Sequence, residues 1–146
     1  MKRFSVGLAV VSCLFTLLLL SGCGEAEREC DSLDARNSVM KIIRDDNNNA
    51  LVNFALKNSS SLDTMMGVTK SEPEKMAIWE NAKRGAIYKL DDPIIIKSSS
   101  RATREVTCSG ILSVTVADTT AEKEMEFRVE HTTDGKMLVS VSPFLF

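Results

Sequence analysis

The stretch VTCSGILSVTV, Val106 to Val116, decides the fold class because its apolar and polar side chains alternate. Successive side chains of a strand point to opposite faces of a sheet, so a period of two predicts a strand with one face in the core and one in water. Threonine and serine occupy most of the polar positions. The apolar set is Val106, Cys108, Leu112, Val114 and Val116, with Gly110 between them.

The same alternation continues downstream of this stretch. Met125, Phe127 and Val129 alternate with charged residues, which predicts a second half-buried strand. Thr133-Asp134-Gly135 then forms a turn signal, and Lys136–Ser142 is expected to pair back as a hairpin.

Upstream of the stretch, two more short strands are predicted. Ala86–Leu90 and Ile94–Ser98 have strand-like composition, and Asp91-Asp92-Pro93 interrupts them. Together these segments predict an antiparallel sheet of about four strands with one solvated face.

The chain before the strands is helical in pattern from Asp31. Asp31 or Ser32 can cap a helix whose apolar positions recur at helical spacing. The polar run Asp45–Asn49 leaves open one long helix with a weak middle or two helices, and one helix is the prediction we favour. The apolar positions are Val39, Ile42, Ile43, Ala50, Phe54 and Ala55.

A second helical segment follows a predicted loop over Lys57–Thr69. Ser71–Glu74 resembles a capping box with proline in the first turn, and Gly85 is placed to end the helix. Met76, Trp79 and Ala82 are expected to line its buried face.

Helices first and strands afterwards predict a single α+β domain over residues 30–146. The expected architecture is N-terminal helices packed on the antiparallel sheet. This order of elements resembles small cystatin-like and nuclear-transport-factor-like domains, and the resemblance extends to the fold alone.

The N-terminus has the layout of an export signal. Lys2 and Arg3 precede an almost wholly apolar run, Phe4 to Leu20. The run ends in Leu20-Ser21-Gly22-Cys23, which resembles the lipobox of bacterial lipoproteins. The resemblance implies a signal peptide over residues 1–22, acylation of Cys23 by chains such as palmitate, and a lipidated tether over residues 23–29. A retained transmembrane helix is the alternative.

If the chain is exported, each of its four cysteines has an expected role. Cys13 leaves with the signal, and Cys23 takes the lipid. In an oxidising compartment, Cys30 and Cys108 are then expected to form a disulfide that joins the first helix to the buried face of the sheet. The alternative is a metal site, but two cysteines and the single His131 are too few ligands for a closed tetrahedral site. No metal or cofactor is expected.

The lipoprotein resemblance also implies a location. Gly24 follows the acylated cysteine where inner-membrane lipoproteins commonly have aspartate, so the outer membrane is expected, with the domain facing the periplasm. The tether Gly24–Glu29 reaches only about 20 Å when extended, which keeps the domain near the bilayer.

The net charge and the absence of catalytic motifs limit the classes of function that we expect. Removal of Lys2 and Arg3 leaves 16 of the 18 basic residues against 20 acidic ones, a net charge of −4, and nucleic acid is not an expected partner. No catalytic motif is present, and His131, at the end of a predicted strand, is expected to be a half-buried structural residue. We therefore expect no enzymatic activity and no catalytic residues.

The predicted function is a non-catalytic binding or structural role in the cell envelope, with the bilayer and another envelope protein as partners. The Ser/Thr-rich sheet face and a Ser98–Ser100 loop are the candidate surfaces. One alternative is an inhibitor or exclusion lipoprotein acting on an envelope enzyme or an incoming secretion or phage apparatus, since Val106–Gly110 resembles a run in periplasmic lysozyme inhibitors. Another is a carrier of an apolar ligand inside a cystatin-like cup.

Overall fold

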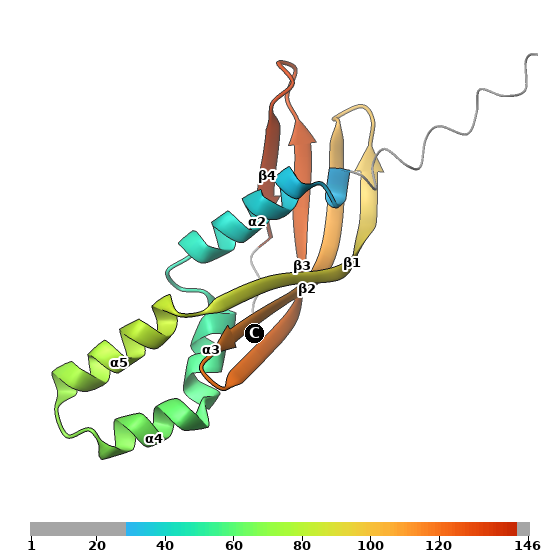
Figure 1. Ribbon diagram of the computed structural model, residues 1–146. Helices are drawn as coiled ribbons and strands as arrows, with labels where there is room; N and C mark the ends of the chain where they lie inside the picture. The colour runs from blue at the N-terminus through green and yellow to red at the C-terminus, as the bar shows by residue number, and fades with distance from the viewer. Residues whose placement is uncertain (1–28, 143–146) are drawn as a thin grey trace, which may run out of the picture.

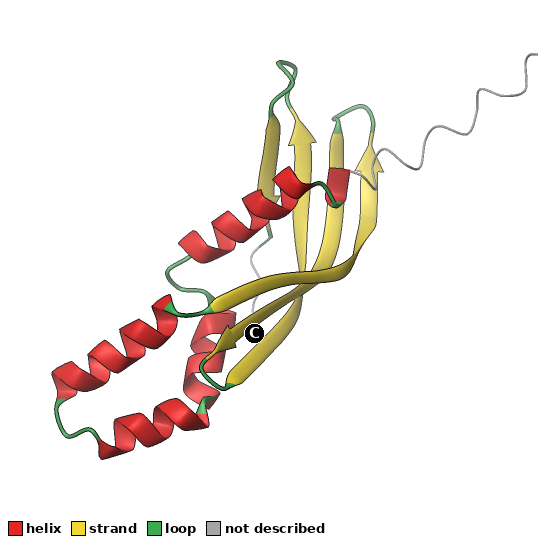
Figure 2. Ribbon diagram, in the orientation of Figure 1, coloured by secondary structure: helices red, strands yellow, loops and turns green. Residues whose placement is uncertain are grey.

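The computed structural model describes residues 29–142, which form helices followed by one antiparallel sheet (Figures 1 and 2). This architecture confirms the predicted α+β class. The predicted signal peptide, Cys23 and the predicted tether up to residue 28 lie outside the described residues. The elements are α2 (Leu33–Asp45), α3 (Ala50–Asn58), α4 (Ser60–Val68), α5 (Glu72–Arg84), β1 (Ile87–Ser100), β2 (Glu105–Val116), β3 (Thr119–His131) and β4 (Met137–Val141).

The sheet has the strand order β1-β2-β3-β4, with every neighbouring pair antiparallel. Cys108 pairs with Phe127, and Val106 pairs with Val129, so the predicted apolar positions of β2 and β3 share the inner face. The predicted turn before β4 is confirmed. Gly135 adopts φ +81 there, a left-handed conformation that glycine tolerates best.

β1 is one long strand, so the prediction of two short strands was wrong. Pro93 lacks an N–H group and cannot donate to the ladder, and the pairing with β2 shifts register between Asp91 and Ile95 while the strand continues. Gly110 lies opposite this irregularity. A Cβ atom on Gly110 would lie 3.1 Å from Leu90 Cδ1, so the glycine leaves the inner face open for Leu90.

The polar run after residue 45 separates α2 from α3, so the prediction of one helix was wrong. Asn49 is buried and caps α3: its Oδ1 accepts hydrogen bonds from the N–H groups of Leu51 (3.0 Å) and Val52 (3.3 Å). Its Nδ2 donates to the Ile43 carbonyl at the end of α2 (3.4 Å). Asn49, which is unfavourable inside a helix, therefore stabilises the junction by capping α3 and bonding to the end of α2.

α4 occupies most of the segment predicted as a loop, and that prediction was also wrong. Ser59 is its N-cap, and Asp118 from the turn between β2 and β3 binds the same helix start. The Asp118 carboxylate accepts from Ser60 Oγ (2.7 Å), Ser61 Oγ (2.9 Å) and the Ser61 N–H (3.2 Å), and also from Ser59 Oγ. A carboxylate at a helix N-terminus satisfies N–H groups that have no partner inside the helix.

α5 begins after Ser71 and ends at Gly85, as predicted. Ser71 makes no side-chain capping hydrogen bond, so the predicted capping box does not form. Trp79 and Ala82 pack against the core, whereas Met76 is 69% exposed. The helix therefore contacts the core through only part of its predicted face.

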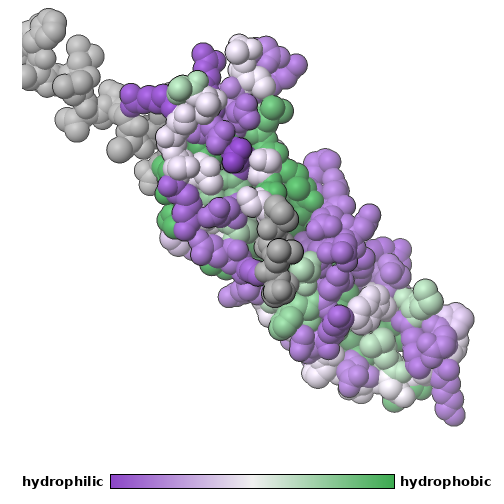
Figure 3. Space-filling view, turned by 180° about the vertical axis from the view of Figure 1, so that it is seen from behind, coloured by the Kyte–Doolittle hydropathy of each residue, from purple (hydrophilic) through white to green (hydrophobic). Residues whose placement is uncertain are grey.

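The core lies between the inner face of the sheet and the helices α2 and α3 (Figure 1). α4 and α5 extend beyond the sheet at the end opposite the β3–β4 turn. Seen from behind, mostly hydrophilic side chains cover the visible surface, with hydrophobic patches among them (Figure 3).

The outer face of β2 is less exposed than predicted. Ser109 and Ser113 are buried, at 1% and 7% exposure. Side chains of the flanking strands cross over β2: Ser113 donates a hydrogen bond to Asp91 of β1, and an ion pair of 3.0 Å joins Lys97 of β1 to Glu124 of β3. The predicted open Ser/Thr surface is therefore partly covered.

The Asp118 contacts predict an acid-sensitive attachment of α4. The hydroxyls of Ser59, Ser60 and Ser61 hold the pKa of the Asp118 carboxyl far below its usual value of 3.8. Because the pKa is lower in the folded state than in the unfolded state, the ionised carboxylate stabilises the fold at any pH above the unfolded-state pKa. That contribution is lost as the pH falls below about 4. Asp118→Asn removes this carboxylate, so it should lower the melting temperature at pH 7. The variant should also lose less stability than the wild-type protein when the pH falls from 5 to 2.

The matched control is Asp63→Asn. Asp63 lies in the first turn of α4, and its carboxylate has no hydrogen-bond or ion-pair partner within residues 29–142. Thermal unfolding followed by circular dichroism measures both variants. Equal melting temperatures for the two variants across this pH range would contradict the role of Asp118.

Candidate functional site

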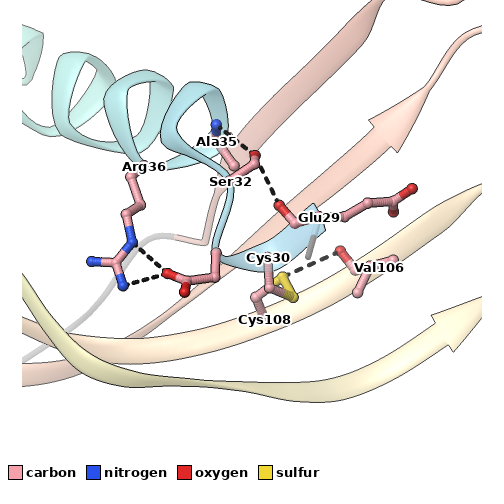
Figure 4. The surroundings of a disulfide bond; sticks show 8 residues. Glu29, Cys30, Ser32, Ala35, Arg36, Val106 and Cys108 are labelled. Atoms are coloured by element: carbon pink, nitrogen blue, oxygen red, sulfur yellow. Dashed lines mark hydrogen bonds and ion pairs between the residues drawn. A yellow bond between two sulfur atoms is a disulfide. The ribbon is translucent and has the colours of Figure 1, made fainter. Parts of the chain in front are cut away.

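A disulfide joins the start of the described chain to the buried face of the sheet, as predicted. Cys30 and Cys108 are bonded with their Cα atoms 5.8 Å apart and 78 residues apart in sequence. Both residues are buried, with exposures of 1% and 0%. The bond therefore lies within the core, between the first turn and β2 (Figure 4).

Polar contacts next to the disulfide fix the first helix. Ser32 is the N-cap of α2: its Oγ accepts from the Ala35 N–H (3.1 Å) and donates to the Glu29 carbonyl (3.1 Å). The Arg36 guanidinium pairs with Asp31 beside the cap and with Asp92 of β1. The helix start is thus attached to β1 by charge and to β2 by the covalent bond.

A cavity of about 430 Å³ opens at this end of the sheet, and we call it the disulfide cavity. Three separate pieces of chain form it: the first described turn, the β1–β2 connection and the β3–β4 turn. Its lining residues are Glu29, Ser99, Ser100, Arg101, Arg104, Glu105, Val106, His131, Thr132 and Gly135.

A backbone hydrogen bond joins the β1–β2 connection to the end of β3 at the disulfide cavity. The His131 N–H donates to the Arg104 carbonyl (3.0 Å), and Arg104 adopts φ +51 at the end of the β1–β2 connection. The Lys136 N–H donates to Thr132 Oγ1 (3.1 Å) and closes the β3–β4 turn. The His131 Nε2 lies 3.5 Å from Glu29 Oε1, so the imidazole connects the first turn to β3.

Among the charged residues that line the disulfide cavity, two arginines have no partner within residues 29–142. Glu105 is paired with Arg128 (3.1 Å), and Glu29 faces His131. The exposed side chains of Arg101 and Arg104 form no ion pair or hydrogen bond within residues 29–142. Guanidinium groups bind carboxylates and phosphates through two parallel hydrogen bonds, so this rim has the chemistry to hold an acidic group.

The disulfide cavity only partly matches the predicted surface. Ser99 and Ser100 line it, but they belong to the end of β1, so the predicted Ser98–Ser100 loop is in fact strand. His131 is half-buried, as predicted, and it also forms part of the cavity wall. Sequence reasoning missed Arg101 and Arg104, although two arginines three residues apart after a serine run are a visible signal of a charged turn.

A metal cluster and a membrane-spanning helix are both absent from the described part of the chain. From Glu29 to Ser142, no three His, Cys, Asp or Glu side chains are grouped so that they could hold a metal ion. Over the same residues, no helix combines the length and apolar character needed to cross a bilayer.

The chain has no detectable relative in the comparisons: no family model, no curated protein and no solved structure matches it.

The disulfide should carry a large share of the stability. Replacement of Cys30 and Cys108 together by alanine is expected to cost about 2–5 kcal/mol of unfolding free energy, as for native disulfides of small exported domains. Urea unfolding measures the change. Reductant should destabilise the wild-type protein and leave the double variant unchanged. Alkylation of either cysteine in the folded, unreduced protein would contradict the bond.

Proposed function

We propose that this protein is a lipid-anchored, non-catalytic binding protein of the bacterial cell envelope. The observation that carries the proposal is the buried Cys30–Cys108 disulfide, since such bonds form and persist in oxidising compartments outside the cytoplasm. It supports export of the domain and agrees with the sequence Leu20-Ser21-Gly22-Cys23, where acylation and cleavage are proposed.

The spacing along the chain gives the anchored domain an orientation. Only six residues, Gly24–Glu29, separate Cys23 from Cys30, and they extend to about 20 Å at most. Glu29 lines the disulfide cavity. A lipid on Cys23 would therefore keep the cavity within reach of the membrane surface and direct α4 and α5 away from it. Two or three acyl chains suffice for stable attachment, because each buried methylene contributes about 0.8 kcal/mol.

The partner proposed for the disulfide cavity is an envelope protein that presents an acidic group close to the membrane, here the outer membrane on its periplasmic side. Arg101 and Arg104 are the groups that would bind it. An inhibitor or exclusion lipoprotein could bind its target through the same two arginines, and that alternative function stays a prediction. The carrier of an apolar ligand also stays a prediction.

Acylation is tested by Cys23→Ser. The variant should accumulate as an unprocessed precursor without palmitate label, because the modifying enzyme needs the thiol. The wild-type protein should fractionate with the outer membrane. Palmitate labelling that persists in the variant would refute the anchor, whereas labelled wild-type protein in inner-membrane vesicles would refute only the sorting.

The partner surface is tested by in-cell photocrosslinking from Thr103, which is exposed between the two arginines. Arg101→Ser combined with Arg104→Asn should reduce the partner crosslink at least about tenfold, since hydrogen bonds between charged groups contribute about 1.5–3 kcal/mol. Asparagine is chosen at 104 because it tolerates the left-handed conformation. Lys70→Ser removes an exposed cation between α4 and α5 and should change nothing. Equal crosslinking in all three proteins would contradict the assignment.

A further inference from the structure

β1 forms one edge of the sheet (Figure 1). One side of the strand pairs with β2 at positions from Ile87 to Ser100. Within residues 29–142, no strand pairs with its other side. The edge of a sheet presents a row of N–H and C=O groups that have no partner in the ladder, and such a row is a template for pairing with another chain.

A side chain of α2 closes part of this edge. Arg36 Nη1 donates a hydrogen bond to the Leu90 carbonyl (3.3 Å), and the same guanidinium pairs with Asp92. The next residue, Pro93, has no N–H group to donate to a further strand. Addition of a strand is therefore disfavoured over the stretch from Leu90 to Pro93.

The segment Ile94–Ser100 of the same edge lies beyond these contacts, and we call it the open edge. It carries apolar side chains on both faces, because Ile95 and Ile96 are successive residues of a strand, with exposures of 47% and 37%. An exposed lysine often guards a sheet edge against pairing. Here Lys97 is already paired with Glu124 on β3 at 3.0 Å, so its charge is directed across the sheet.

The open edge leads directly into the two arginines of the disulfide cavity. Arg101 follows Ser100 in a turn that is closed by a hydrogen bond from the Thr103 N–H to Ser100 Oγ (3.3 Å). Arg104 is fixed at the other end of the turn, because its carbonyl accepts from the His131 N–H (3.0 Å). The fixed turn holds two cations that have no ion-pair partner within residues 29–142 beside the end of the open edge.

We propose that the open edge binds an extended segment of the envelope partner, which adds a fifth strand beside β1. This inference rests on the proposed function, because it describes how the partner of Arg101 and Arg104 is held. The added strand is antiparallel, like every other pair in the sheet. It therefore begins beside Ser100, where its acidic residues meet the two arginines, and continues past Ile95 with apolar side chains at alternate positions.

A second copy of this chain fits the open edge less well than an acidic strand. Antiparallel pairing of Ile94–Ser100 with itself is centred on Lys97, so the lysines of the two copies would lie opposite each other. Like charges directly opposite each other destabilise a strand pair. A strand that begins with acidic residues instead supplies the charges that Arg101 and Arg104 lack.

The test compares photocrosslinking from two positions of the full chain in intact cells. Benzoylphenylalanine at Ile95 and at Thr103 should label one segment of one partner. Because a strand rises about 3.4 Å per residue, the two labelled positions should lie about five to ten residues apart, with the Thr103 contact first in the partner's sequence. The same probe at Ile87, which is 67% exposed at the start of β1, should not label that segment.

The outcomes separate this inference from the proposed function. Labelling from Thr103 without labelling from Ile95 would overturn strand addition and leave the acidic partner intact. Labelling from neither position would overturn both. Crosslinks from Ile95 to a second copy, to residues 24–28 of the same chain or to lipid would also overturn strand addition, and the reverse order of the two contacts would contradict its antiparallel direction.

A synthetic peptide gives a second measurement with a defined ligand. Asp-Glu-Thr-Val-Thr-Val-Thr should slow amide exchange in Ile94–Ser100 of the membrane-extracted protein, because main-chain hydrogen bonds form along the open edge. Lys-Lys-Thr-Val-Thr-Val-Thr should bind at least about tenfold more weakly, since it cannot pair with the arginines. Arg101→Ser combined with Arg104→Asn should remove the difference between the peptides. Unchanged exchange at about 1 mM acidic peptide would overturn the strand addition.

Discussion

The covalent bond between Cys30 and Cys108 is the constraint on which the other features of the domain depend. It closes a loop of nearly 80 residues, and the chain-entropy model gives such a closure roughly 4 kcal/mol of stabilisation. Because Cys108 is the fourth residue of β2, an inner strand of the sheet, the first turn is held against the buried face near one end of the sheet. The cap at Ser32 and the pairing of Arg36 with Asp92 then direct α2 across the inner face.

The molecule has a second polar attachment at its other end. Asp118, in the turn between β2 and β3, binds the start of α4 through the hydroxyls of Ser59, Ser60 and Ser61. β2 thus carries the disulfide near its start and leads at its other end into the turn that holds the helical extension. The β3–β4 turn, which lines the disulfide cavity, and the α4–α5 extension lie at opposite ends of the molecule (Figure 1), so one end can face the proposed anchor while the other remains accessible.

The predictable parts of the fold are those set by local periodicity. The parity of Val106, Cys108 and Val114 identified the buried face of β2, because a period of two is visible within a single strand. The junction at Asn49 was missed because a residue unfavourable inside a helix is favourable as its cap. α4 was missed because the group that stabilises its start, Asp118, lies more than 50 residues away. The disulfide cavity could not be predicted either, since three distant turns form it, although Ser99 and Ser100 were among the residues proposed for a binding surface.

The central claim is that an acylated Cys23 begins the mature chain and keeps the disulfide end of the domain at the membrane. Mass spectrometry of the N-terminal tryptic peptide from membrane-extracted protein tests it most directly, because trypsin cleaves after Arg28 and releases Cys23–Arg28 as one peptide. The account predicts a peptide that starts at Cys23 and carries the mass of diacylglycerol, with or without a third acyl chain. A peptide that starts before Cys23, or an unmodified Cys23 thiol, would contradict it.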